Sequence, residues 1–184
     1  AGCVQYQPYW CWATSISMSA GYYFPNSYPN GGHDGPNCRG MECRIVGEYH
    51  FPETPNKCCQ DKDACFHLEA GSGARIVDAL KRYTKIPWTR INVPVSESLV
   101  TRVMLDGNPI VWDVKLPQPI GGGHAMVMGG TDGEGTFYVH DPMNADGIGS
   151  FQSLKWSEVL QYKLPWQKGG VAESWGVYVP GKYV

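Results

Sequence analysis

The sequence is organised around residues 5–13, QYQPYWCWA, which begin with Gln5 and run through Cys11 into Trp12 and Ala13. A glutamine six positions ahead of a Cys-Trp-Ala turn brings a side-chain amide close to a sulfur atom. A cysteine nucleophile requires such a partner, because its oxyanion hole needs donors aimed at the oxygen where negative charge develops. We therefore expect Cys11 to be a nucleophile and Gln5 to supply one donor.

The residues that follow Cys11 predict a buried helix that ends near Tyr23. Small and apolar side chains, among them Ile16 and Ala20, recur there at helical spacing. Pro8 is a suitable residue just before such a helix. The free amides and the positive dipole end of a helix N-terminus stabilise a thiolate. The backbone N–H of Cys11 would then be the second donor of the oxyanion hole.

The length and charge of the chain limit its organisation and its partners. A chain of 184 residues fits one compact domain, or two small lobes that share a cleft. The net charge is −2 and no run of lysine and arginine exceeds two residues, so we expect neither nucleic acid nor a membrane as a partner. The apolar stretches are well short of the ~20 residues that span a bilayer. We expect a soluble monomer that binds a protein or peptide substrate.

The cysteines indicate an oxidising environment. The chain has seven, all within its first 65 residues: Cys3, Cys11, Cys38, Cys43, Cys58, Cys59 and Cys65. Three disulfides would leave one free thiol, as expected of an exported protein with a single reactive cysteine. The chain starts at Ala1 without a basic or apolar targeting segment. We therefore expect a secreted, mature form from which a signal or pro-segment has been removed.

The stretch from Phe24 to Ser72 predicts a long loop held by disulfides, because it is rich in turn residues and contains five of the cysteines. Cys58 and Cys59 are adjacent, and a ring between neighbours is strained, so each is expected to have a distant partner. The rest of the connectivity stays open. Zinc is an alternative for this segment, with Cys38, Cys43, Cys58, Cys59, Cys65 and His67 as ligands, although the paired Cys-x₂-Cys spacing is missing.

The second half of the chain reads mostly as sheet. Ser72 and Ser96 are N-cap candidates for helices over 73–85 and up to Gly107, and a short strand is expected over 91–95. Residues 110–114 predict a buried strand, and residues 124–141 predict a β-hairpin with its turn near Gly133. Further along, we expect a loop over 147–153, a short helix over 155–162 and a closing strand over 175–179.

The predicted hairpin completes a catalytic group. Antiparallel pairing brings Asp141 almost opposite His124, so that the two side chains can share a face. Acyl transfer by a thiol needs a sulfur, an imidazole, a group that orients the imidazole and oxyanion donors. Cys11, His124, Asp141 and Gln5 supply these in that order. The glycine run at 121–123 would let a substrate backbone approach the cleft closely.

Each candidate also has a structural interpretation. Cys11 could be a buried structural thiol or a disulfide partner, and His124 could be a core histidine bonded to backbone. Asp141 could simply end its strand before a proline, with Asn144 as its competitor, and Gln5 could be an exposed residue near a fraying terminus. Structural or solvated roles are expected for the other histidines, which are His33, His50, His67 and His140.

These residues resemble the papain-like cysteine peptidases. The resemblance rests on Gln-x₅-Cys-Trp-Ala in residues 5–13, on GHAMVMGG in residues 123–130 and on a third catalytic residue 17 positions after His124. That third residue is usually asparagine in papain itself. Here it is Asp141 followed by Pro142, which is similar to bacterial branches, namely the bacteriocin-leader-processing peptidases and the secreted effector peptidases of plant pathogens.

The resemblance implies an α+β fold with the active site in a cleft between two lobes of one domain. A helical, disulfide-stapled left lobe would cover about residues 1–90, and an antiparallel, β-barrel-like right lobe about residues 91–184. It also implies that Cys11, His124, Asp141 and Gln5 keep their family roles. The chain departs from the plant papains at Pro8, where they have a disulfide cysteine, so their bridge pattern does not carry over.

The sequence therefore predicts a cysteine endopeptidase that works through a thioester, without cofactor or metal. One alternative keeps the same triad for a deamidase, a transglutaminase-like enzyme or a peptide ligase. Another is a non-catalytic secreted binding module that uses the aromatic residues of the cleft. Sequence leaves the cleavage preference open.

Overall fold

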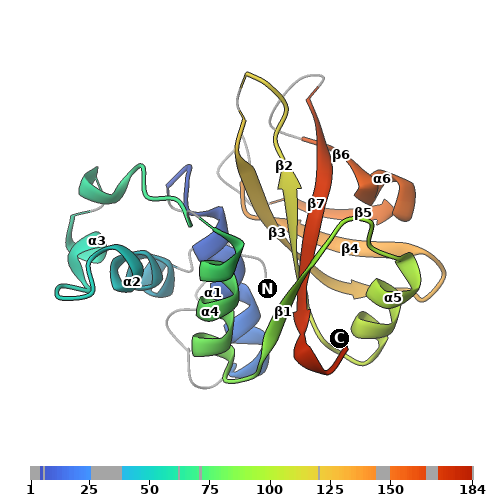
Figure 1. The fold of residues 1–184 in the computed structure, drawn as a ribbon, viewed down its shortest axis with the longest axis horizontal. Helices are drawn as coiled ribbons and strands as arrows, with labels where there is room; N and C mark the ends of the chain where they lie inside the picture. Colours follow the sequence, from blue (N-terminus) through green and yellow to red (C-terminus); the bar gives the residue numbers. More distant parts are fainter. Residues whose placement is uncertain are drawn as a thin grey trace.

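The computed structural model describes residues 5, 7–25, 39–61, 63–70, 72–119, 121–143, 150–164 and 170–183. Helices gather in the first half of the chain and strands in the second (Figure 1). The first half contains α1 (Cys11–Tyr23), α2 (Arg39–His50), α3 (Lys57–Gln60), η1 (Asp63–Cys65) and α4 (Gly73–Thr84). The strands are β1 (Trp88–Asn92), β2 (Ile110–Lys115), β3 (Gly123–Thr131), β4 (Thr136–Asp141), β5 (Ser150–Lys155), β6 (Gln161–Lys163) and β7 (Val171–Pro180). Between and after them lie α5 (Glu97–Leu105), α6 (Trp156–Leu160) and η2 (Gly181–Tyr183).

Helix α1 is buried along most of its length, in contact with α4 and with β3. Two of its buried polar side chains are satisfied locally, since the hydroxyls of Thr14 and Ser19 donate to carbonyls one turn back at 3.0 and 2.9 Å. Ser15 Oγ instead donates to the carbonyl of Ala125 in β3 at 3.1 Å. The predicted helix from Cys11 to Tyr23 is therefore confirmed, and its polar residues attach it to the sheet.

The loop predicted for residues 24–72 is wrong between residues 39 and 50, where the structure has α2. Met41, Ile45 and Val46 are buried on this helix and pack against α1. Their spacing is helical, but the proline- and glycine-rich residues on both sides conceal the signal, and packing against α1 outweighs the local propensity.

Two disulfides fasten this region. Cys43 in α2 bonds to Cys59 in α3, and Cys58 in α3 bonds to Cys65 in η1. The prediction that adjacent Cys58 and Cys59 have separate partners is confirmed. The zinc alternative is wrong for these four sulfurs, because a disulfide sulfur is not a thiolate ligand.

Four of the residues singled out in the sequence, namely Cys3, His33, Cys38 and Asn144, lie outside the described residues. The same holds for residues 147–149 of the loop expected before the predicted C-terminal helix.

The two capped helices form as predicted. Ser72 Oγ and Ser96 Oγ each accept the backbone N–H three residues later, at 3.3 Å, and thereby begin α4 and α5. The strand predicted over 91–95 lies earlier, at β1. Pro94 accounts for the shift, because it has no N–H with which to continue a strand ladder.

The strands form one sheet with the order β1-β7-β2-β3-β4-β5, and β6 pairs with the first residues of β7. This sheet is open, which corrects the barrel-like shape expected for the second lobe. Strand β7, expected as a short closing strand, runs over ten residues and pairs with both β1 and β2. The mixed α+β fold class is confirmed.

Both faces of the sheet are covered (Figure 1). Along β3, Ala125 and Val127 join the core with α1 and α4, whereas Met126 and Met128 join the core with α5. This alternation follows from the period of two in a strand, and burial of both faces explains why residues 125–128 are all apolar.

The chain after β4 differs from prediction. Residues 150–153, expected as loop, belong to β5, which pairs with β4 over its full length. The helix expected up to residue 162 ends at Leu160, and residues 161–163 form β6. Tyr162 consequently lies on a strand, with its side chain fully buried.

Candidate active site

Cys11 is the first residue of α1, and its side chain is 7% exposed. Its sulfur accepts the backbone N–H of Ala125 at 3.5 Å. Ala125 directly follows His124 in β3, so the contact fixes the start of the helix against the strand that carries the imidazole. Among the cysteines of the described part of the chain, Cys11 is the free thiol.

His124 and Asp141 form a buried pair. The predicted hairpin is β3 and β4, and its register aligns Val127 with His140, so Asp141 comes one position further, towards His124. His124 Nε2 donates to Asp141 Oδ1 at 2.6 Å, and the two side chains are 2% and 0% exposed. The prediction that the hairpin brings Asp141 to His124 is confirmed.

The imidazole of His124 is held in its charged form. Burial lowers the pKa of His124, but the negative charge of Asp141 and the sulfur of Cys11 oppose this and raise it from 6.5 to about 10. The largest favourable contribution comes from Asp141, and hydrogen bonds to both partners add to it. The groups thus follow one another from carboxylate through imidazole to sulfur, an arrangement in which the imidazole can exchange a proton with the thiol.

The Asp141 carboxylate is held by further donors. The backbone N–H of Met143 donates to Oδ1 at 2.8 Å, and the hydroxyl of Tyr162 donates to Oδ2 at 3.1 Å. Gln152 Nε2 donates in turn to the Tyr162 hydroxyl at 2.7 Å. Sequence reasoning missed Tyr162 and Gln152, because neither local pattern nor spacing reveals that β5 pairs with β4 and β6 with β7.

Comparison with known protein families identifies the chain. A model of the Peptidase_C39 like family matches residues 2–170. The protein belongs to this family. It is accordingly a papain-like cysteine peptidase, a class of hydrolase, and its family implies protein substrates. The predicted family resemblance and the predicted enzyme class are confirmed, and a comparison with curated proteins gives no match.

Solved structures show the fold of this C39-like peptidase in another protein. A chain described as a C39-like peptidase from Bacillus anthracis has a TM-score of 0.50 and 14% identity, over 94% of this chain and 93% of that one. The avirulence protein AvrPphB of Pseudomonas has a TM-score of 0.36 and 10% identity over 96% of both chains, and nothing is inferred from it.

Gln5 lies close to the buried pair of the peptidase. Its backbone N–H donates to the carbonyl of Pro142, the residue after Asp141, at 3.0 Å. Its side-chain Nε2 donates to the carbonyls of Gln7 and Pro8 at 3.0 and 2.7 Å. The Gln5 amide is therefore directed back to the turn that leads into α1, and its buried Oε1 has no hydrogen-bond partner among the residues that the structure describes.

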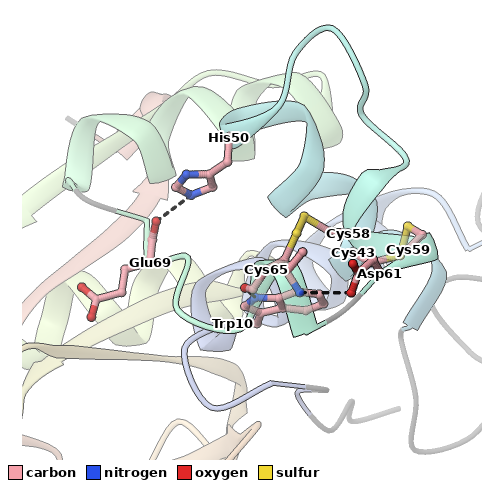
Figure 2. The surroundings of a disulfide bond; sticks show 9 residues. Trp10, Cys43, His50, Cys58, Cys59, Asp61, Cys65 and Glu69 are labelled. Carbon is pink, nitrogen blue, oxygen red and sulfur yellow. Dashed lines mark hydrogen bonds between the residues drawn. A yellow bond between two sulfur atoms is a disulfide. The ribbon is translucent and has the colours of Figure 1, made fainter.

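The disulfide-fastened segment holds the residue just before Cys11. The indole Nε1 of Trp10 donates to the carbonyl of Cys65 at 3.0 Å, and its side chain is fully buried. Figure 2 shows Trp10 beside Cys65, from which the disulfide runs to Cys58. Trp10 is the N-cap residue of α1, so this contact connects the bridge to the position of the sulfur in the C39-like peptidase.

A second charged group lies next to the imidazole. Asp113 on β2 pairs with Ala125, and its Oδ2 is 3.3 Å from Arg90 NH2 and 3.4 Å from the Tyr178 hydroxyl. Burial raises the pKa of Asp113, although Arg90, Tyr178 and His124 each lower it. No sequence pattern indicates this group, since its members come from β1, β2 and β7.

Gly123, the residue before His124, lies where a side chain would be crowded. A Cβ atom on Gly123 would lie 3.1 Å from the Trp175 ring and 3.3 Å from Asp113 Oδ1. Trp175 is partly exposed, and the Arg90 guanidinium lies 5.9 Å from its ring centre. These distances leave little space for a side chain, which explains glycine at this position. The close approach of a substrate backbone stays a prediction.

The other described histidines, His50, His67 and His140, lie in surroundings that suit structural roles. His50 Nε2 lies 2.9 Å from the carbonyl of Glu69, as Figure 2 shows, and burial lowers the pKa of His50. The His67 ring packs against Phe66 and Tyr9. His140 precedes Asp141 on β4 and is less buried than its neighbours, as expected for the opposite face of the strand.

Proposed function

We propose that the protein is an endopeptidase that hydrolyses internal peptide bonds through a thioester on Cys11. Its central support is the buried line from Asp141 through His124 to Cys11, at the junction of α1 and the sheet. Asp141 orients His124, and His124 carries the proton for the sulfur. Family membership favours hydrolysis over the deamidase, transglutaminase-like and ligase alternatives and over a non-catalytic binding module.

The proposed reaction has two halves. The Cys11 thiolate attacks the carbonyl carbon, and the resulting oxyanion collapses as the C–N bond breaks and imidazolium His124 gives its proton to the leaving amine. The acyl group then remains on the sulfur as a thioester. A water molecule, deprotonated by His124, attacks the thioester carbon. The C–S bond breaks, which releases the carboxylic acid product and restores the thiolate.

The proposed oxyanion donors are the backbone N–H of Cys11 and the side chain of Gln5. The first-turn amides of a helix have no acceptor within the helix, so the Cys11 N–H is suited to a developing negative charge. Gln5 Nε2 has two backbone acceptors in the present structure. We infer that one of these bonds is exchanged for the oxyanion when substrate binds, since catalytic hydrogen bonds often align only in the complex.

We also propose that the enzyme works outside the reducing cytosol, as a secreted protein. Two disulfides fasten the region that packs against Trp10. Such bridges persist in oxidising compartments. No helix in the described ranges is long and apolar enough to cross a membrane.

The test is hydrolysis of unfolded protein substrates by the wild type and by Cys11→Ala, with products identified by mass. We expect two fragments from each cleaved bond for the wild type, and no turnover for Cys11→Ala, because the nucleophile is gone. Unfolding curves that coincide would show that the variant is folded. A wild type that leaves chains whole but alters glutamine side chains, or that joins chains, would favour the alternative chemistries. Turnover by Cys11→Ala would refute the assignment.

A further inference from the structure

Tyr162 binds the triad carboxylate on the side away from His124. Its hydroxyl donates to Asp141 Oδ2 at 3.1 Å, whereas His124 Nε2 binds Oδ1. Tyr162 is fully buried, and it comes from β6, which the sheet order separates from β4. Its contact with Asp141 is therefore made by the side chain reaching across the sheet.

The direction of the Tyr162 hydroxyl proton is determined by Gln152. Gln152 lies on β5 opposite Val139 of β4, and its Nε2 donates to the Tyr162 oxygen at 2.7 Å. A hydroxyl that accepts this bond has its own proton left to donate, and Asp141 Oδ2 is the acceptor. The tyrosine ring packs edge-on against Trp112, with ring centres 5.2 Å apart, which limits its rotation.

The Asp141 carboxylate needs donors on both oxygens. A buried carboxylate is costly unless hydrogen bonds replace its hydration, and bonds to a charged acceptor are the stronger ones. On Oδ1 it accepts from His124 Nε2 and from the Met143 N–H. Without a donor on Oδ2, the carboxylate could turn about its Cβ–Cγ bond, and the His124 contact would lose its geometry.

We propose that Tyr162 is a positioning residue of the peptidase, which holds Asp141 in the orientation that His124 requires, and that Gln152 directs its hydroxyl. This inference rests on the proposed roles of Cys11, His124 and Asp141. Tyr162 binds the carboxylate through its hydroxyl, so we expect it to act on His124 through Asp141.

The test compares Tyr162→Phe with Tyr83→Phe. Tyr83 is a matched control, because its buried hydroxyl also donates to a carboxylate, that of Glu48, at 2.6 Å, but in the helical half of the chain. For Tyr162→Phe we expect kcat to fall about tenfold, as for a lost bond to a charged group, with KM within a factor of about two. For Tyr83→Phe we expect kcat to stay unchanged.

The pH profile separates positioning from mere structural support. The titratable groups facing His124 are Cys11 from α1, Asp141 from β4 and Asp113 from β2. Asp141 raises the pKa of His124, so a displaced carboxylate should move the alkaline limb of activity to lower pH, by about one unit for a tenfold effect. The alkaline part of the pH profile for alkylation of Cys11 by iodoacetamide should also move to lower pH.

The alkylation profile keeps the inference testable if no peptide is cleaved. If wild type lacks hydrolytic activity, the proposed function fails, yet the profile still shows whether Tyr162 acts on the Cys11–His124 pair. If Tyr162→Phe does not fold, Gln152→Leu replaces it, with a smaller shift expected in the same direction. An alkaline limb that stays unchanged, or moves to higher pH, in the folded variant would overturn the inference.

Discussion

The two halves of the molecule position the proposed catalytic groups by different means. In the helical half, covalent bonds hold the segment that contacts Trp10, just before Cys11. In the sheet half, where the sequence has no cysteine, strand register and hydrogen bonds hold His124 and Asp141. The sulfur should therefore depend on the bridges for its position, whereas the imidazole should depend on donors around one carboxylate.

The sharpest probe of the sheet half is Asp141→Asn, which keeps the shape and removes the charge. We expect kcat to fall roughly 10²-fold, the lower end for loss of acid–base function. The Asp141 charge raises the pKa of His124 to about 10, so the imidazolium persists until pH rises through that value. Without that charge the pKa falls, and the alkaline limb of kcat/KM moves to lower pH.

The same substitution tests stability. Because the pKa of folded His124 is raised, its charge interactions stabilise the fold fully below 6.5 and are lost as pH rises through about 10. Thermal unfolding of Asp141→Asn should therefore vary less with pH between these values than that of wild type. Equal pH dependence of unfolding in the two proteins would contradict the assigned pairing.

The helical half is probed by removing one bridge at a time. Cys58→Ser/Cys65→Ser opens the bridge next to Trp10, and Cys43→Ser/Cys59→Ser is the matched control. From loop length alone, the first pair costs about 2 kcal/mol and the second about 3 kcal/mol of unfolding free energy. For kcat, measured well below the unfolding temperature, we expect the opposite order. Cys58→Ser/Cys65→Ser should lose several-fold in kcat, and Cys43→Ser/Cys59→Ser should not.

Denaturant unfolding and kcat, measured on the same samples, check this expectation. If both double variants lose activity in proportion to their lost stability, the bridges act only on the fold. The inference that the bridge next to Trp10 positions the Cys11 sulfur would then be wrong.

The smallest effect concerns the thiols themselves. We expect alkylation of the unfolded but unreduced protein to label one cysteine, Cys11, and labelling after reduction to reach all seven. Mass spectrometry of the labelled peptides is the measurement, and reduced, folded protein is the control. A second labelled site before reduction would break the prediction of six paired cysteines.

Local signals account for what the sequence predicted. Ser72 and Ser96 begin helices through contacts within three residues, and the hairpin that joins His124 to Asp141 is a short-range unit with its own turn. The four candidate site residues can be predicted for the same reason, because the spacing of two motifs and one hairpin is enough to select them.

Non-local packing accounts for what the sequence did not predict. Helix α2 depends on contact with α1, and its flanking prolines and glycines conceal its apolar positions. Tyr162 reaches Asp141 because its side chain crosses the sheet, and Gln152 reaches the Tyr162 hydroxyl because β5 pairs with β4. No pattern within these segments indicates such partners, so neither residue could be chosen in advance.

The double burial of β3 protects the catalytic geometry against change in chain length. Its alternate residues are shared between two hydrophobic cores, so inserting or deleting one residue after His124 would send alanine and valine to a space shaped for methionine, and the reverse on the other face. Both cores would lose their fit in one step. The register of this strand, and with it the distance from the imidazole to the carboxylate, is thus maintained by side chains that take no part in the chemistry.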